Sequence, residues 1–373
     1  MAKSIIKDPG YLYYDMVVTN RFSSSGRNNT PLRFTDTRSS YMLQDPGNFK
    51  MSVIKFQLDT TSIPLHRFDI QPFRGDVNLG IYSITLELVD GINPPISTNA
   101  EYLIWSPVNL DSQIPSSPIA GYQIDSEYYY SYSFEHFLRL ANEAFFRALE
   151  KLVQLIQPDA FLDTAGSPFL IWSADRESAT LYAENEFFDQ QLDKHVNIYF
   201  NRPMYNLFNS FPVINMSHNA TKNRNYMIVI QNLKANIKQL GQTDYIKLDQ
   251  EYSCTQNWSP VSAIVFTTSN LPIVSNQLAP PQLYENNKPV LLNRGIDDTQ
   301  NIISDFSTDE LCYRPNLLYL PPGTYRYISM YHTTPLKQIS IEVYWRDKYG
   351  FMHPYYLDPS NSASLKLLFK KIK

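Results

Sequence analysis

The sequence is poor in charge and in glycine for a chain of 373 residues. Charged residues make up 18% of it, against a usual share of about 25%. Lys and Arg number 32 and Asp and Glu 36, which leaves a net charge of −4. Because a protein whose main task is to hold nucleic acid normally shows a basic excess, we expect no strong nucleic-acid binding. The low count of 12 glycines argues against folds that rely on Gly-rich phosphate loops.

Long apolar runs are also missing. No stretch of about 18 uninterrupted apolar residues occurs, so we expect no membrane span. Residues 1–7 lack the apolar run of a signal peptide, which predicts a protein made in the cell interior and not secreted. The two cysteines, Cys254 and Cys312, could form one bridge, but two reduced thiols fit an intracellularly made protein better.

Aromatic residues and proline are abundant instead, with 27 Tyr, 21 Phe and 25 Pro. This composition favours strands joined by long, stiff connections. Apolar residues alternate along many short segments, and the alternation in residues 49–59 slips by one residue at Val53-Ile54. A β-bulge, or a strand buried on both faces, would explain the slip. The clearest strands are expected at 11–20, 49–59, 81–90, 339–346, 351–357 and 363–369.

One segment has a helical period. Apolar residues recur at steps of three or four over residues 134–156, with Ser133 placed as an N-cap and Pro158 after the end. The apolar stripe, which includes Phe145, predicts a helix that packs on the strands.

Strands predominate and do not alternate with helices, which argues against a parallel α/β sheet. We therefore predict a mainly β fold, an antiparallel β-sandwich with insertions and one amphipathic helix at about 134–156. Residues 1–130 and 245–373 are expected to form the sandwich together, and 131–244 a helix-containing insertion. The alternative is two consecutive jelly rolls, 1–200 and 201–373. Three polar or Pro-rich segments are predicted as arms or loops, namely 21–48, 106–126 and 275–300.

No pattern of catalytic or metal-binding residues emerges. The six histidines are not at metal-ligand spacing, and no Gly-x-Ser-x-Gly, P-loop or Gly-x-Gly-x-x-Gly motif occurs. Asp297-Asp298 and Asp309-Glu310 are adjacent carboxylates, which point to opposite faces when the backbone is extended. We therefore predict no catalytic, cofactor-binding or metal-binding residue and no enzymatic activity. The histidines are His66, His136, His195, His218, His332 and His353.

Three surface patterns could bind a partner. Tyr128, Tyr129, Tyr130 and Tyr132 could stack on sugars or bases, although a half-buried strand or interface segment is favoured. Two short basic stretches could touch nucleic acid or an acidic neighbour, and solvated chain is the default interpretation of both. They consist of Arg21, Arg27, Arg33 and Arg38, and of Lys366, Lys370, Lys371 and Lys373.

Several motifs occur together in one order along the chain. They are Ser62-Ile63-Pro64-Leu65, residues 204–211 and 263–272, Thr333-Thr334-Pro335-Leu336, and the segment 339–357 with its turn at 347–350. In this order, from about residue 11 to 372, the chain resembles the penton-type jelly-roll capsid proteins of polinton-like viruses and virophages. The resemblance implies a viral jelly roll, a structural virion protein without a cofactor, and a ring of five copies at the capsid vertex.

The expected location is therefore the virion capsid. The resemblance implies that the partners are copies of the chain itself as a pentamer and neighbouring major capsid proteins, and a host receptor that no residue identifies. Two alternatives stay open: a compact double jelly-roll major capsid protein, and a carbohydrate-binding β-sandwich module of the fibre or lectin kind. A free monomer with a sugar-lined groove would favour the last of these.

Overall fold

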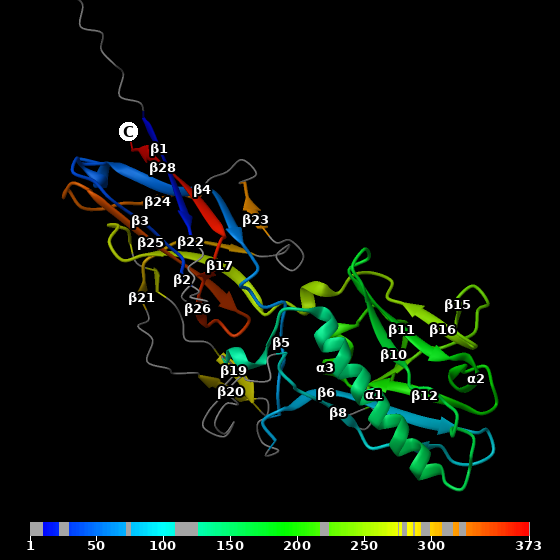
Figure 1. Cartoon of the computed structure of the whole chain (residues 1–373). Helices are drawn as coiled ribbons and strands as arrows, with labels where there is room; N and C mark the ends of the chain where they lie inside the picture. The colour runs from blue at the N-terminus through cyan, green and yellow to red at the C-terminus, as the bar shows by residue number, and fades with distance from the viewer. Residues whose placement is uncertain are drawn as a thin grey trace, which may run out of the picture. The chain divides into compact units, whose positions relative to one another are not determined.

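The computed structural model describes residues 10–21, 30–71, 76–108, 126–216, 224–274, 276–277, 282–285, 288–291, 299–307, 316–320 and 326–372. The fold is mainly β, as predicted, and its named strand pairs are antiparallel (Figure 1). The chain divides into two compact units. The first comprises Met1–Ile63 with Pro260–Lys373, and the second Pro64–Ser259.

The first unit is an antiparallel sandwich of two sheets. One sheet has the order β1-β28-β4-β23, with β24 also paired to β4. The other has the order β22-β17-β25-β26, with β3 also paired to β25. The strand bounds are β1 Tyr11–Thr19, β2 Thr30–Pro31, β3 Arg33–Thr37, β4 Phe49–Asp59, β17 Val261–Thr268, β18 Asn276–Gln277, β19 Gln282–Glu285, β20 Lys288–Leu291, β21 Thr299–Gln300, β22 Ile302–Ser307, β23 Asn316–Tyr319, β24 Ile328–Ser329, β25 Gln338–Asp347, β26 Met352–Pro354, β27 Tyr356–Leu357 and β28 Ser362–Lys371.

Aromatic rings fill the space between these two sheets. Phe56 of β4 lies with its ring centroid 5.1 Å from that of Phe266 on β17 and 4.9 Å from that of Phe306 on β22. Phe56 and Phe266 are fully buried. Because the rings come from strands of both sheets, they are the hydrophobic core that holds the sandwich together.

The slip in the alternation of β4 is a β-bulge. Lys55 lies opposite Lys366 of β28, and Val53 lies opposite Leu367, so that Ile54 has no partner in the β28 register. Ile54 is nevertheless buried. The bulge keeps apolar side chains on the core side both before and after it.

The segment 21–48 is not the plain loop or arm that its composition predicts. Residues 33–37 form β3, and Phe34 and Leu32 are buried in the sandwich. These two apolar residues alternate with Arg33, whose charge is neutralised by a salt bridge to Glu342. Further along the segment, Leu43 forms an isolated bridge with Leu336. The predicted loop 275–300 lies partly outside the described residues, and its described part forms strands: β18 pairs with β21, and β19 with β20.

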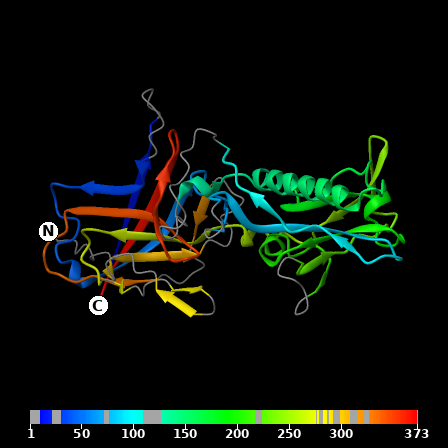
Figure 2. The ribbon, with the colours of Figure 1, turned by 90° about the horizontal axis from the view of Figure 1, so that it is seen from below.

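The second unit combines two sheets with the long helix α1. One sheet has the order β13-β14-β12-β6-β7, with β8 paired to β6, and the other β10-β11-β16-β15. Figure 2 shows α1 lying along this unit, where it packs on β6, β8 and β10. The bounds are β5 His66–Arg67, β6 Leu79–Val89, β7 Ile96–Ser97, β8 Glu101–Ile104, β9 Tyr130–Ser131, α1 Phe134–Ile156, β10 Phe169–Ser173, β11 Ser178–Glu184, α2 Asn185–Phe188, β12 His195–Phe200, α3 Arg202–Leu207, β13 Val213–Asn215, β14 Tyr226–Ile228, β15 Ile237–Leu240 and β16 Thr243–Asp249.

The helix has the predicted bounds, 134–156, and its stripe, which includes Phe145, is buried except for Leu155 near the C-terminal end. Ser133 has the extended backbone of an N-cap, but its side chain makes no capping hydrogen bond. Strand β6 is buried on both faces, because Ser83, Thr85 and Glu87 on its polar side are buried as well.

The bounds of the two units differ from the expected domain bounds. Residues 64–130 cluster with the second unit because β6 pairs with β12, and residues 245–259 do so because β16 pairs with β11. The pairing of β28 with both β1 and β4 brings the two ends of the chain into the first unit. Two consecutive jelly rolls, 1–200 and 201–373, do not match this clustering.

Candidate functional surfaces

The described histidines lie in separate local environments. The His66 Nδ1 atom is 3.2 Å from the carbonyl oxygen of Trp258, and the His195 Nδ1 atom is 2.7 Å from that of Leu192. Burial lowers the pKa of His136. Among the residues that the structure describes, no three His, Cys, Asp or Glu side chains form a group that could hold a metal ion.

The predicted cysteine and acidic pairs can be placed only in part. Cys254 is a buried free thiol, and its Sγ atom lies 2.7 Å from Oδ1 of Asn209. Cys312 and His218 lie outside the described residues, as do the acidic pairs at 297–298 and 309–310.

The acidic residue of the C-terminal turn is structural. Asp347 is buried, and its Oδ1 atom accepts hydrogen bonds from the backbone N–H groups of Tyr349, at 2.8 Å, and Phe351, at 2.9 Å. Its Oδ2 atom lies 3.2 Å from Nε2 of His353. Gly350 takes a φ of +87°, a conformation that favours glycine. The carboxylate therefore stabilises the turn that joins β25 to β26.

Buried carboxylates of the second unit are also held by fixed partners. Glu87 accepts hydrogen bonds from the hydroxyls of Tyr199, at 2.5 Å, and Ser97, at 2.8 Å, and pairs with Arg224 at 2.7 Å. Burial, and then the hydrogen bond to Glu87, raises the pKa of Tyr199. With every oxygen of Glu87 engaged, this cluster stabilises the fold and offers no free acid or base.

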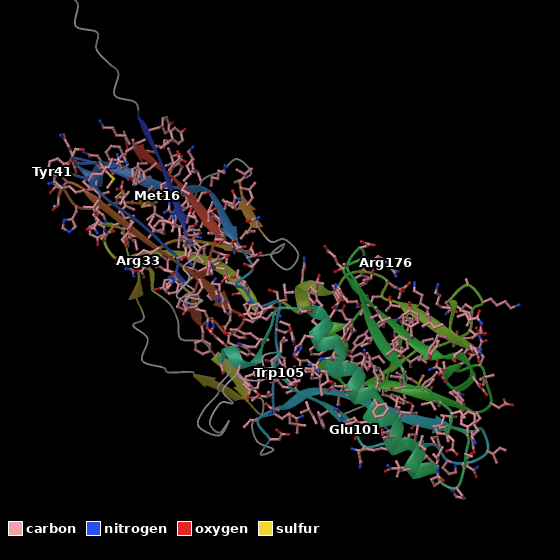
Figure 3. All side chains as sticks on the ribbon, in the orientation of Figure 1. Met16, Arg33, Tyr41, Glu101, Trp105 and Arg176 are labelled. Atoms are coloured by element: carbon pink, nitrogen blue, oxygen red, sulfur yellow. The ribbon has the colours of Figure 1, made fainter. Side chains whose placement is uncertain are left out.

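Asp249 ties two strands of the same unit together. It pairs with Arg176, labelled in Figure 3, and with Lys247, each at 2.8 Å, and accepts a hydrogen bond from Thr180 at 2.6 Å. Partial burial raises the pKa of Asp249, but these three hydrogen bonds outweigh it and hold the pKa well below its usual range.

The tyrosine cluster before the helix mostly packs against its own unit. Tyr129 and Tyr130 are buried, and the Tyr129 hydroxyl donates to the carbonyl of Val77 at 2.7 Å. Burial raises the pKa of Tyr129 to about 12. Only Tyr132 of this cluster is well exposed, so these rings do not form a stacking platform.

Two of the four early arginines form ion pairs within the sandwich. Arg33 pairs with Glu342 at 2.5 Å, and Arg38 pairs with Asp36 at 2.9 Å. Arg27 lies outside the described residues. The basic loop inferred from the sequence is therefore not an open basic surface at these two positions.

A groove of about 590 Å³ runs between α1 and the edge strand β10. The side chain of Asn142 closes part of the strand edge, because it donates to the carbonyl of Leu170 at 3.0 Å and accepts from its N–H at 2.7 Å. Phe146 and Ile171 are exposed there, and Arg139 and Glu143 form an ion pair of 2.9 Å. The groove combines apolar and paired charged groups, so it carries no excess of either charge.

One end of the sandwich exposes apolar side chains from three segments, and we call it the loop end. It contains Tyr41, labelled in Figure 3, with Val274 and Tyr331. Backbone hydrogen bonds hold the segments together, from Met42 N–H to the Leu336 carbonyl and from Tyr331 N–H to the Pro272 carbonyl. Exposed apolar groups gathered on a fixed frame are typical of protein-protein contact sites.

The basic C-terminal stretch belongs to a strand and is not a solvated end. Lys366 and Lys370 project from β28, and the pairing of β28 with β4 adds Lys55 and Lys50 beside them. The sequence placed Lys50 and Lys55 in a strand, but only the register of the bulged pair shows that they face the tail lysines.

Known viral proteins are similar to this chain in sequence. The sequence model of the family described as Sputnik minor capsid protein V18/19 matches residues 12–371. Structural protein V19 of Sputnik virophage is 26% identical over 209 residues, which cover 54% of this chain and 92% of that protein. Uncharacterized protein V18 of the same virophage is 25% identical over 159 residues, which cover 41% and 91%.

Solved structures share the fold over nearly the whole chain. A chain in the cryo-EM structure of the Sputnik virophage aligns with a TM-score of 0.82 and 24% identity, covering 98% of this chain and 99% of that chain. The crystal structure of mavirus penton protein aligns with a TM-score of 0.62 and 16% identity, covering 97% and 99%. No helix in the described part of the chain is long and apolar enough to cross a membrane.

Proposed function

The chain belongs to the Sputnik minor capsid protein V18/19 family, and from this membership we propose that it is a structural capsid protomer that assembles with copies of itself into a penton-like ring. The observation that carries the proposal is the family match over residues 12–371. The fold likeness to mavirus penton protein over 97% of the chain supports it. The same proposal places the protein in the virion capsid after synthesis inside a host cell.

The work of such a protein is non-covalent. The family is one of structural capsid proteins, which agrees with the expectation that the chain is not an enzyme. A closed ring uses two different surfaces of each copy, one against each neighbour. The loop end offers one such surface, and the groove between α1 and β10 offers another. Neighbouring major capsid proteins are the proposed partners outside the ring.

The number of copies in solution tests the proposal. Native mass spectrometry of the purified protein should show a closed ring, and five copies of the 43.2 kDa chain have a mass of about 216 kDa. A stable monomer at micromolar concentration would contradict the ring. A closed ring of a different size would agree with the capsid role but contradict the role at a five-fold vertex.

A charge placed in the loop end tests which surface is used. Val274→Asp should reduce the fraction of rings because it puts an unpaired carboxylate into an apolar contact. Leu233→Asp is the matched control, since both side chains are 64% exposed and Leu233 lies in the second unit. Equal ring yields for both variants would mean that the loop end is not an assembly contact.

A further inference from the structure

The net charge of the chain conceals a strong asymmetry between its two units. The first unit, residues 1–63 and 260–373, contains 19 Lys and Arg against 14 Asp and Glu, a net charge of +5. The second, residues 64–259, contains 13 against 22, a net charge of −9. The low overall charge therefore describes neither unit. The electrostatic field of the first unit attracts a polyanion, and that of the second unit repels it.

Four lysines of the first unit lie on one outer face of its sheet, and we call them the lysine face: Lys50, Lys55, Lys366 and Lys370. Lys55 is directly opposite Lys366, and Lys50 is directly opposite Lys370, across the pair formed by β4 and β28. Like charges placed directly opposite each other destabilise a sheet. The fold thus contains two repulsive pairs that its own packing does not require.

Little in the described part of the chain neutralises these charges. Asp15 of β1 lies 3.2 Å from Lys366, and its side chain is mostly exposed. Lys50 and Lys55 are exposed and form no ion pair with any described acidic side chain. Since Lys366 and Lys370 are four residues apart in a strand, the two lysine pairs are separated by roughly 13 Å along the sheet.

Exposed tyrosine rings lie beside the lysines on the same face. β1 is the edge strand next to β28, and its inner residues include Met16, labelled in Figure 3, while Tyr11 and Tyr13 point outward. Tyr11 is 49% and Tyr13 57% exposed. Lys370 Nζ lies 5.6 Å from the centroid of the Tyr11 ring, and Lys366 Nζ lies 5.9 Å from that of Tyr13.

We propose that the lysine face and the adjoining tyrosines bind single-stranded nucleic acid, with the lysines on phosphate groups and the tyrosine rings on unpaired bases. Lysine is a good phosphate ligand, and base stacking on aromatic rings tolerates any sequence. A capsid encloses nucleic acid, so this role goes beyond ring formation and does not depend on the number of copies. With at most four phosphate contacts, the binding is weak and salt-sensitive, which is compatible with the absence of a strong basic excess.

Other anionic partners fit the face less well. Lysine is depleted at protein-protein contacts, so a face that carries four lysines does not resemble the core of an interface with another capsid protein. Binding to a lipid surface needs apolar side chains that enter the bilayer boundary. The remaining outward residues here include Gln57 of β4 and Ser364 of β28, which are polar. Val17 of β1, opposite Ser364, is apolar and exposed, but one valine provides little surface for insertion into a bilayer.

The salt dependence of binding tests the proposal. The test is fluorescence anisotropy of a labelled oligothymidylate of about 20 nucleotides. For the full-length protein, the logarithm of the binding constant plotted against the logarithm of the salt concentration should have a slope near −2.8, which is a loss of affinity of about 50-fold between 50 and 200 mM salt. The double variant Lys50→Gln/Lys55→Gln should halve this slope, so that the loss of affinity over the same salt range falls to about sevenfold. Lys234→Gln/Lys238→Gln, at exposed positions of the second unit, removes the same charge and should leave the slope unchanged.

The tyrosines have a separate readout. Tyr11→Leu/Tyr13→Leu should weaken binding of the single strand by about fivefold or more without changing the salt slope, and should leave duplex binding unaltered. Equal slopes for the two lysine variants would overturn the proposal. So would lysine-dependent binding to phosphatidylserine vesicles or polyglutamate that is as tight as binding to DNA. Melting and native mass of each variant separate these outcomes from misfolding and from loss of the ring.

Discussion

Truncation of Phe145 tests how α1 is held on its unit. Phe145 has no exposed surface, and its ring centroid lies 6.1 Å from that of Phe200 on β12. The neighbouring residue Phe146 is 54% exposed on the same helix. The two phenylalanines therefore have the same chemistry and the same helix propensity but opposite burial, which makes Phe146→Ala a matched control for Phe145→Ala.

Phe145→Ala should lower the free energy of unfolding by about 3–5 kcal/mol, because a buried ring is removed and the surrounding helix and strands can only partly close the cavity. Phe146→Ala should cost less than about 1 kcal/mol, as exposed substitutions do. With a urea m-value of about 2 kcal/mol/M, the midpoint of unfolding should fall by roughly 1.5–2.5 M for Phe145→Ala.

Tryptophan fluorescence during urea unfolding is a suitable measurement. Three of the four tryptophans, Trp105, Trp172 and Trp258, belong to the unit that contains α1, so the signal reports chiefly on that unit. Measurements at two protein concentrations separate unfolding from dissociation of a ring. A loss below about 1 kcal/mol for Phe145→Ala, or equal losses for both variants, would refute the inference that this stripe holds the helix in place.

Four further predictions follow from the contacts described above. Asn142→Ala should cost about 1–3 kcal/mol in urea unfolding because it removes both hydrogen bonds to the backbone of Leu170. Asp347→Ala should cost about 2–4 kcal/mol because two backbone N–H groups lose a charged acceptor, and Asp347→Asn should cost less. Burial lowers the pKa of His136 in the folded state, so stability should fall as pH drops below the unfolded value of about 6.5, and His136→Gln should reduce that fall. Deletion of residues 1–9, which lie outside the described residues, should leave the melting temperature unchanged and lower ring yield, because the segment is polar; a large drop in melting temperature with normal assembly would contradict this.

Local patterns in the sequence determined several elements of the fold. The bounds of α1 at 134–156 follow from a long 3.6-residue period that ends before Pro158. The bulge in β4 follows from the one-residue slip at Val53-Ile54, and the turn at 347–350 from two strong alternating segments on either side of it. These signals are local, so they can be recognised without knowing which segments become neighbours in the fold.

Only the tertiary structure decided the rest, because it depends on which distant strands pair and in which register. The chain passes from one unit to the other after residues 63 and 259, and no composition change in the sequence marks these boundaries. The sequence did not reveal β3 within its polar stretch, since one buried residue in five is too few for a periodicity signal. The opposition of Lys55 to Lys366 arises from pairing across about 300 residues of chain and from the bulge that shifts the register. A net charge and a list of basic residues could not reveal a charged face of this kind, because strand pairing alone determines which side chains share one side of a sheet.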